Sequence, residues 1–195
     1  MKVSRTQSVK NRSHIVETAS VLFRERGYDG VGVAELMAAA GFTHGGFYRH
    51  FQSKGDLMTE AVTCGIAQTV AASDGLDIAG FVQRYVSREH RDGRSTGCTM
   101  AALSGDAARQ PAAVKAAFAD GIESAVAAIL EHDGVVGVGA ADQPEARAKI
   151  VDTLAHLVGA IVLSRACPDD SPLADEILAA SRNAILASLA PADTR

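Results

Sequence analysis

The sequence predicts an all-α protein of about nine helices, with a three-helix head at the N-terminus followed by a larger helical bundle. Apolar residues recur at helical spacing, as in Val114, Phe118, Ile122 and Val126. No segment of the sequence has the sustained two-residue alternation of a strand. Glycine, proline and hydroxyl residues mark the expected helix ends. The expected helices are residues 8–26, 33–40, 44–50, 53–72, 77–90, 97–108, 111–132, 144–165 and 172–189, with a glycine-rich loop at 134–140.

Glycines and capping residues in the first sixty residues predict a helix-turn-helix. Gly27 and Gly41 follow apolar helical stretches, where a glycine commonly ends a helix. Thr43 stands at the N-cap of a short third helix, and Ser53 with Asp56 forms a capping box that opens the next one. A short helix that follows a tight turn in this way can lie in the major groove of DNA.

Composition indicates a soluble protein with an aliphatic core. Of its 195 residues, 47% are hydrophobic, only 5% are aromatic, and tryptophan is absent. The longest uncharged apolar stretch, 153–164, is too short to span a bilayer, and residues 1–20 lack the apolar region of a signal peptide. Three scattered cysteines predict neither a disulfide framework nor a metal site. We therefore expect a cytoplasmic protein with no membrane partner.

Charge is distributed unevenly along the chain. Residues 1–54 contain eight Lys or Arg and four acidic residues, a balance of +4, whereas the whole chain has a formal net charge of −4. A basic head on an acidic body suits a protein that presents one end to phosphates. The alternative is that these N-terminal charges are simply solvated.

The segment GYDGVGVAELMAAAGFTHGGFYRHFQSKGDL resembles the DNA-binding domain of the TetR family of bacterial transcriptional regulators. The resemblance covers about a quarter of the chain, and the remaining helices agree in number and arrangement. It implies a DNA-binding domain at residues 1–54 and a ligand-binding and dimerisation domain at 55–195. It also implies a homodimeric repressor without a cofactor, which reads a pseudo-palindromic operator in double-stranded DNA and is released by a small molecule of unknown identity. The matching residues are Gly27, Tyr28, Ala39, Ala40, Gly41, Thr43, Gly45, Phe47, Tyr48, Phe51, Ser53, Lys54 and Leu57.

The resemblance assigns the helix at 44–50 to the major groove. Arg49 is the candidate for direct base reading, because a guanidinium can bridge both acceptors on a guanine edge. Tyr48 and His50 are expected to donate to phosphates, and Lys54 to add a point charge. Phe47 and Phe51 are expected to face inward. The complete set of candidate DNA-binding residues is Thr43, His44, Gly45, Tyr48, Arg49, His50 and Lys54.

Three glycines depart from the family pattern. Gly32 stands where a Ser or Thr usually caps the second helix, Gly46 replaces a small hydroxyl residue, and Gly55 replaces an acidic residue. A glycine inside a helix costs about 1 kcal/mol relative to alanine. These departures keep open the alternative of a helical adaptor that has lost DNA binding.

The bundle carries apolar residues that could line a ligand cavity between helices. Most of them could equally be ordinary core. Cys98 is the sharpest case, because a helix N-terminus and the neighbouring Arg88, Arg91 and Arg94 would favour a reactive thiolate. The Gly97-Cys98 pair also resembles a subgroup of the family that includes electrophile-sensing members, although an inert thiol is the alternative. The candidate ligand-binding residues are Met58, Cys64, Phe81, Tyr85, Cys98, Met100, Phe118, Ile122 and His156.

The last two helices each carry an apolar stripe that could form a two-fold interface. The alternative is that the stripes pack against each other within one chain. The candidate dimerisation residues are Leu154, Leu157, Val158, Ile161, Leu178, Ile185 and Leu189.

No catalytic motif stands against the regulator interpretation. The sequence contains no HExxH, CxxC or phosphate-binding loop, and the glycine-rich run 134–139 follows no predicted strand. We therefore expect no enzymatic activity, with a thiol-redox protein as the remaining alternative.

Overall fold

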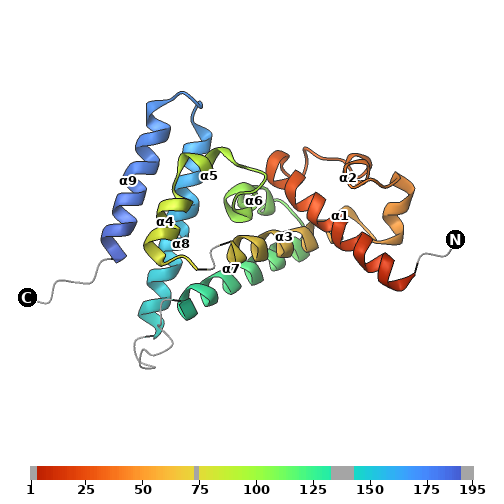
Figure 1. Cartoon of the computed structure of the whole chain (residues 1–195), viewed down its shortest axis with the longest axis horizontal. Coiled ribbons are helices and arrows are strands. Elements are labelled where there is room, and N and C mark those ends of the chain that lie inside the picture. The colour runs from red at the N-terminus through yellow and green to blue at the C-terminus, as the bar shows by residue number, and fades with distance from the viewer. Residues whose placement is uncertain (1–3, 73–74, 133–142, 190–195) are drawn as a thin grey trace, which may run out of the picture. The chain divides into compact units, whose positions relative to one another are not determined.

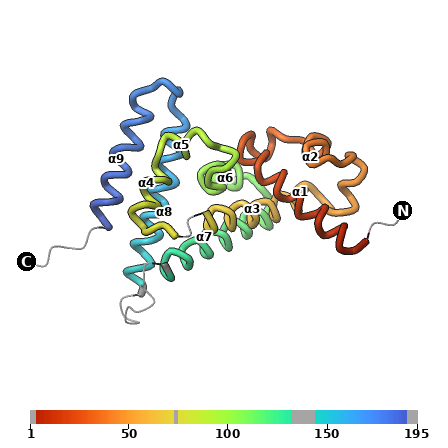
Figure 2. Tube along the Cα trace, in the orientation of Figure 1, coloured from red at the N-terminus to blue at the C-terminus, as the bar shows by residue number. Residues whose placement is uncertain are grey.

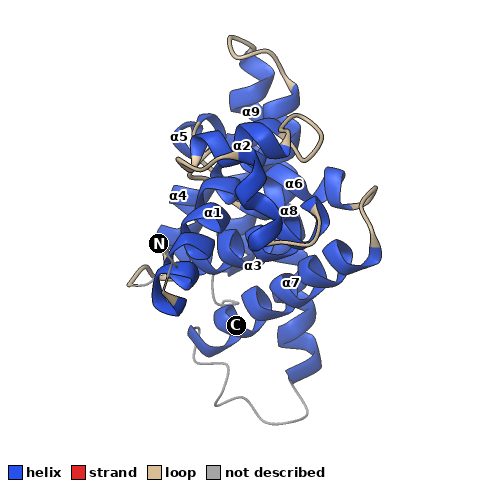
Figure 3. Ribbon diagram, turned by 90° about the vertical axis from the view of Figure 1, so that its right-hand side faces the viewer, coloured by secondary structure: helices blue, strands red, loops and turns tan. Residues whose placement is uncertain are grey.

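The computed structural model describes residues 4–72, 75–132 and 143–189. All regular structure in these ranges is helical, which confirms the all-α prediction (Figure 3). The loop expected at 134–140 lies outside the described residues. Within the described ranges the elements are α1 (Arg5–Arg26), α2 (Val33–Ala39), the 3₁₀ helix η1 (His44–Arg49), α3 (Lys54–Ala71), α4 (Ile78–Tyr85), α5 (Arg88–Asp92), α6 (Thr99–Ala107), α7 (Ala112–His132), α8 (Gln143–Ala166) and α9 (Pro172–Leu189) (Figure 1).

The helices form two compact units. The first unit contains Met1–Thr69 and Arg94–Ile122, and the second contains Val70–Gly93 and Glu123–Arg195. The chain passes between the units within α3, after Gly93 and within α7 (Figure 2). The first unit therefore holds more than residues 1–54, because α6 and the first half of α7 belong to it. We call residues 4–54 the head.

The helix ends of the head follow from their end residues. The Ser4 hydroxyl accepts the Gln7 N–H at 3.1 Å and starts α1, and Gly27, with φ +74°, ends it. Gly41, with φ +78°, follows α2 in the left-handed conformation that glycine favours. The capping box at α3 is also confirmed. Ser53 Oγ accepts the Asp56 N–H at 3.1 Å, and Asp56 Oδ2 accepts the Ser53 N–H at 3.2 Å.

Thr43 occupies the N-cap position of η1, but its side chain makes no capping hydrogen bond. The N-cap position was predicted correctly, although the Thr43 hydroxyl does not cap η1. The short helix itself is 3₁₀, with three residues per turn, and contains the adjacent Gly45 and Gly46. Two glycines in six residues supply little intrinsic tendency to form an α-helix.

The helix expected at 77–90 is two helices, because Ser87 interrupts it. The Ser87 hydroxyl donates to the Arg84 carbonyl at 2.8 Å and accepts the His90 N–H at 3.1 Å. It therefore ends α4 and caps α5 with the same side chain. The described chain consequently has nine α-helices and one 3₁₀ helix, where about nine helices were expected.

Each unit has its own apolar core. In the first unit the largest fully buried side chains include Phe23, Tyr28 and Phe47, and the Phe23 and Tyr28 rings meet edge to face at 5.1 Å. In the second unit α8 packs along α9 and buries Leu157, Ile161 and Leu178. The predicted aliphatic core is therefore accurate for the second unit, whereas the core of the head combines aliphatic residues such as Ile15 and Leu36 with aromatic rings.

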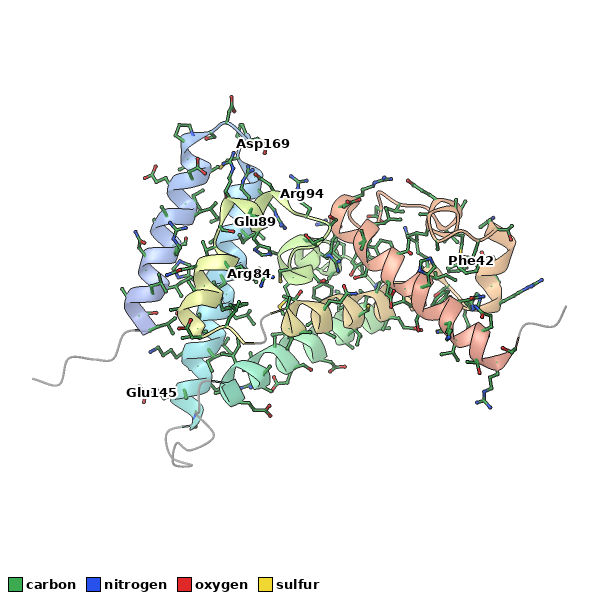
Figure 4. The ribbon with its side chains drawn as sticks, in the orientation of Figure 1. Phe42, Arg84, Glu89, Arg94, Glu145 and Asp169 are labelled. Carbon is green, nitrogen blue, oxygen red and sulfur yellow. The ribbon has the colours of Figure 1, made fainter. Side chains whose placement is uncertain are left out.

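Two buried arginines organise polar contacts within the units. Arg24 of α1, 6% exposed, donates to the Ser95 carbonyl at 2.8 Å and to Ser20 Oγ at 2.7 Å. Arg91 of α5, 2% exposed, donates to Ser164 Oγ at 3.1 Å and to Asp169 at 3.0 Å. Asp169 lies at the turn between α8 and α9 (Figure 4). Arg24 thus ties α1 to the segment before α6, and Arg91 ties α5 to the α8–α9 hairpin.

We predict that Gly46→Ala stabilises the protein. A Cβ at Gly46 would lie 3.6 Å from Met37 Cε, an ordinary contact, and the backbone there is compatible with alanine. Alanine reduces the freedom of the unfolded chain, so the free energy of unfolding should rise by about 0.4–1 kcal/mol in urea denaturation.

The matched control is Gly41→Ala. Its φ of +78° strains any residue with a Cβ, so this variant should be less stable than the parent by about 1 kcal/mol or more. A loss of stability in Gly46→Ala comparable to that of Gly41→Ala would show that η1 needs a glycine conformation at position 46.

Candidate DNA-binding surface

Two phenylalanines hold η1 against the rest of the head. Phe47 is 1% exposed and Phe51 is 2% exposed, and their ring centroids are 5.4 Å apart. The prediction that both face inward is therefore confirmed by their burial. Because Phe47 is the one buried residue of η1, the neighbouring residues of this short helix are turned outward.

The outward face of η1 carries the predicted DNA-contact residues. Thr43, His44, Gly45 and Arg49 are exposed, and Tyr48 is 70% exposed although it is a large aromatic residue. In a 3₁₀ helix, side chains three residues apart eclipse each other, so Tyr48 lies in line with Gly45, and Arg49 with Gly46. Tyr48 and Arg49 therefore stand next to stretches of backbone without side chains.

His50 is the C-cap residue of η1 and lies near aromatic rings and arginines. Its backbone N–H donates to the Phe47 carbonyl at 2.9 Å. The Phe42 ring, which Figure 4 labels, has centroid distances of 6.3 Å to His14 and 6.4 Å to His50. Partial burial, Arg12 and Arg49 lower the pKa of His50 below its ordinary value of 6.5. The imidazole therefore resists protonation while the head is free.

Lys54 has a structural role in addition to the one that was expected. Its ammonium donates to the Tyr28 carbonyl and lies 5.9 Å from the centroid of the Phe23 ring. It thereby ties the start of α3 to the turn after α1. An ammonium has three donors, so the bond to Tyr28 still leaves donors for a phosphate.

Two adjoining open grooves border this surface, with volumes of about 510 and 440 Å³. They share Arg12, Thr59 and Glu60, which lie on α1 and α3. The larger groove also includes His50, Phe51 and Gln52, and so adjoins the end of η1. Sequence analysis did not single out Arg12, because nothing in its local sequence distinguishes it from the other N-terminal basic residues.

The expected ligand-binding residues fall into two groups. Met58, Cys98, Met100 and Phe118 are buried in the first unit, where Cys64 is half-buried and Ile122 is 38% exposed. In the second unit Tyr85 is buried and Phe81 half-buried, with ring centroids 5.5 Å apart, whereas His156 is exposed. Of the two grooves described above, only the smaller one includes an expected ligand residue, Cys64.

Cys98 stands at the N-cap of α6, as expected, but it is only 2% exposed. The expected cationic neighbours have other partners, since Arg88 pairs with Asp175 and Arg91 with Asp92 and Asp169. Arg24 is a cation whose charge interacts with Cys98. Burial is the main cause that lowers the pKa of Arg24, and Cys64 and Cys98 oppose that shift. The sequence analysis did not identify Arg24. A possible signal was Ser20, which lies one helical turn earlier and can accept a hydrogen bond from a buried arginine.

Four of the expected dimerisation residues are buried within a single chain: Leu157, Ile161, Leu178 and Ile185. Leu154, Val158 and Leu189 are half-buried. The described structure also leaves a second apolar stripe on each helix, which sequence analysis did not identify. On α8 this stripe includes Val151, Ala155 and Val162, and on α9 it includes Leu173, Ala180, Ala184 and Ala187, all of them exposed.

None of the helices in the described ranges is long and apolar enough to cross a membrane. The same ranges bring together no group of three or more His, Cys, Asp or Glu residues that could hold a metal ion.

Comparison with known proteins locates the sequence similarity in the head. The family model for bacterial regulatory proteins of the tetR family matches residues 15–61. The transcriptional repressor DhaR of Mycobacterium sp. (strain GP1) is 49% identical over 43 residues, which is 22% of each chain. The transcriptional regulator AcrR of Shigella flexneri is 35% identical over 57 residues, 29% of this chain and 26% of the relative. The similarity to these curated relatives thus spans about a quarter of their length.

Solved structures extend the likeness of the fold to nearly the whole chain. The reduced form of NemR from E. coli has a TM-score of 0.67 at 19% identity, covering 89% of this chain and 96% of the other. A TetR-family regulator from Agrobacterium tumefaciens has a TM-score of 0.68 at 19% identity, with coverages of 92% and 98%. AibR, in complex with isovaleryl coenzyme A and operator DNA, has a TM-score of 0.56 at 16% identity, with coverages of 90% and 97%. Residues 15–61 of this chain thus match the model for bacterial regulatory proteins of the tetR family, and its described helices have the fold of solved regulators of that family.

Proposed function

We propose that this protein is a homodimeric transcriptional repressor that binds a pseudo-palindromic operator and releases it when a small molecule binds. The observation that carries the proposal is the outward face of η1, where exposed Tyr48 and Arg49 are held in place by buried Phe47 and Phe51. DhaR, a transcriptional repressor of Mycobacterium sp. (strain GP1), is 49% identical to 43 residues of this chain. A DNA-binding role also accounts for the basic balance of the head.

In the proposed complex, η1 lies in the major groove. The exposed guanidinium of Arg49 makes no hydrogen bond to any part of the chain that the structure describes, so it is available to bridge N7 and O6 of a guanine. Thr43, His44 and Gly45 line the same face, and Tyr48 and His50 donate to phosphates on either side. Lys54 combines its bond to Tyr28 with a charge near the backbone of the DNA.

For the dimer, we propose that the exposed stripes of α8 and α9 form a four-helix interface with the same stripes of a second copy. The small residues Ala155, Ala180 and Ala184 allow close approach of helices. The buried Leu157, Ile161, Leu178 and Ile185 would then support this surface from within each chain, while Leu154, Val158 and Leu189 lie at its edge. Two heads in such a dimer would read half-sites roughly one helical turn, about 34 Å, apart.

Ligand response would be a shift of population. A small molecule that prefers one spacing of the two heads would lower the affinity for an operator that fits another spacing. AibR, which has the same fold, was crystallised with both isovaleryl coenzyme A and operator DNA. The candidate ligand contacts remain in two separate groups. The first unit holds Met58, Cys64, Cys98, Met100, Phe118 and Ile122, and the second holds Phe81, Tyr85 and His156.

The proposal is tested by selecting genomic DNA fragments that bind the full-length protein and measuring affinity as a function of salt. A regulator should enrich a pseudo-palindrome and bind it with a steep dependence on salt concentration. An adaptor or a thiol-redox protein of the same fold would enrich no sequence.

Arg49→Ala and Tyr48→Phe should affect binding to the selected operator differently. Loss of the guanidinium should cost about 1–3 kcal/mol on the operator and relax the preference for one guanine. Loss of the phenol hydroxyl should weaken binding to operator and unrelated duplex by the same factor, because a phosphate contact carries no sequence information. Fluorescence anisotropy with both duplexes measures the two effects. If each variant lost affinity for the operator and for the unrelated duplex by the same factor, this division of roles would be refuted.

DNA binding should strengthen as the pH falls below about 6.5, and His50 should be responsible for part of the effect. Its pKa is lowered in the free head by burial, Arg12 and Arg49, and a neighbouring phosphate would favour the protonated imidazole. Binding should therefore take up a proton at His50.

The measurement is the pH dependence of the dissociation constant for the parent and for His50→Gln. The difference between them isolates His50 from His14 and His44, and identical pH profiles would contradict a phosphate contact. Because the lowered pKa disfavours protonation of the free fold, stability should decline as the pH falls below the unfolded value of His50.

Ala184→Glu should convert the dimer to a monomer. A carboxylate at the centre of the exposed α9 stripe would be buried without a partner in the proposed interface. Sedimentation velocity measures the mass, and Gln83→Glu, an exposed position on α4 with the same charge change, is the control. A dimer that survives Ala184→Glu would place the interface elsewhere.

A further inference from the structure

We propose that Arg12 is a DNA phosphate clamp beside the end of η1, and that Glu60 and Phe51 hold its guanidinium in position for this contact. The inference rests on the proposed DNA-binding function and adds a residue outside the helix-turn-helix to the contact surface. The ligand is a phosphate of the duplex backbone.

Position is the first argument. Arg12 lines the groove of about 510 Å³ together with His50, Phe51 and Gln52, so it is continuous with the C-terminal end of the proposed reading surface. His50 is the C-cap of η1, and the charge of Arg12 reaches it. A phosphate that approached His50 would therefore also be attracted by the positive charge of Arg12.

The guanidinium of Arg12 is fixed in orientation. Its Nε donates to Glu60 Oε2 at 3.1 Å, and its Nη2 donates to Glu60 Oε1. Its central carbon lies 4.3 Å from the centroid of the Phe51 ring, so the cation also rests on an aromatic face. A side chain that is ordered before binding loses less conformational entropy when it takes a ligand.

The bond to Glu60 leaves a second edge of the guanidinium open. Nη1, with two hydrogens, has no hydrogen-bond partner within the ranges that the structure describes, and the side chain is 38% exposed. Nη1 and the remaining hydrogen of Nη2 form a planar fork that matches two oxygens of a phosphate. Arg12 can thus contact Glu60 and a phosphate at the same time.

The carboxylates of the groove do not prevent this contact. Asp56 Oδ2 accepts the backbone N–H groups of Gln52 and Ser53 at 3.0 and 3.2 Å, which offsets part of its charge. Glu60 is paired with Arg12, and a half-exposed ion pair of this kind is weak. A phosphate, stabilised further by His50, can therefore share the guanidinium with Glu60.

The test compares both halves of the ion pair. Arg12→Gln should weaken binding to the selected operator and to an unrelated duplex equally, on the order of tenfold near physiological salt. It should also lower the slope of log affinity against log salt by about 0.9 per head, or about 1.8 per dimer. Glu60→Gln should leave that slope unchanged and affinity equal or higher, because it removes a negative charge near the phosphate.

A matched pair of controls exists in the second unit. Arg147 and Glu123 form a similar two-bond surface pair at 2.9 and 2.7 Å. Arg147→Gln and Glu123→Gln reproduce the two charge changes outside the head, and both should bind DNA as the parent does. Equal losses of affinity from Arg12→Gln and Glu60→Gln would show that the pair only braces α1 against α3, and would overturn the proposal.

A second measurement covers the case in which Arg12→Gln lowers the stability of the head. Neutral methylphosphonates are placed one at a time along the operator, and at one position per half-site the parent should lose affinity while Arg12→Gln should not. If no position distinguishes the two proteins, the clamp does not exist, although the proposed function stands as long as the parent binds its operator. If the parent itself binds no DNA, both proposals fail.

Discussion

The whole candidate surface depends on two buried phenylalanine rings under a helix of six residues. η1 has two adjacent glycines and no side-chain cap, so its own sequence supplies little stability. Phe47 and Phe51 fix its position by burial, and Arg12 extends the same layer by resting on the Phe51 ring. The outward residues are free to meet a ligand because these three residues carry the packing. The position of the exposed residues is thus determined by the buried packing beneath η1.

Buried cations give each unit its second constraint. Arg24 ties α1 to Ser95 and Ser20 in the first unit, and Gly65 of α3 makes room for it, since a Cβ there would lie 2.7 Å from the guanidinium. Arg91 ties α5 to the α8–α9 turn in the second unit. Burying a guanidinium is unfavourable unless hydrogen bonds offset the loss of hydration. Substitutions that remove these hydrogen bonds at Arg24 or Arg91 are therefore expected to destabilise the fold.

Sequence reasoning worked best where a local rule decides the structure. The glycine ends at Gly27 and Gly41, the capping box at Ser53, and the inward Phe47 and Phe51 follow from spacing and backbone chemistry, and the structure agrees. It failed where a single side chain had two possible partners. Ser87 could continue a helix or cap the next one, and it does the latter.

Long-range packing was the other limit of the sequence. The apolar stripe with Leu157 and Leu178 could face a second copy or the neighbouring helix, and helical periodicity is the same in both cases. Arg12 pairs with a residue 48 positions away, and Arg24 with one 71 positions away, so no local pattern indicates either contact. The exposed face of η1 and its buried phenylalanines were predictable from local spacing, whereas the distant partners of Arg12 and Arg24 were not.

In the proposed complex with DNA, the glycines of η1 would limit how many base pairs this surface can distinguish. With Gly45 in line with Tyr48, and Gly46 in line with Arg49, two of the six residues of the helix would present bare backbone to a groove. Few base pairs per half-site can then be distinguished, and short motifs recur by chance throughout a genome. The protein would therefore distinguish true from accidental sites mainly by the distance between two half-sites. That spacing would be more selective than the base contacts within either half-site.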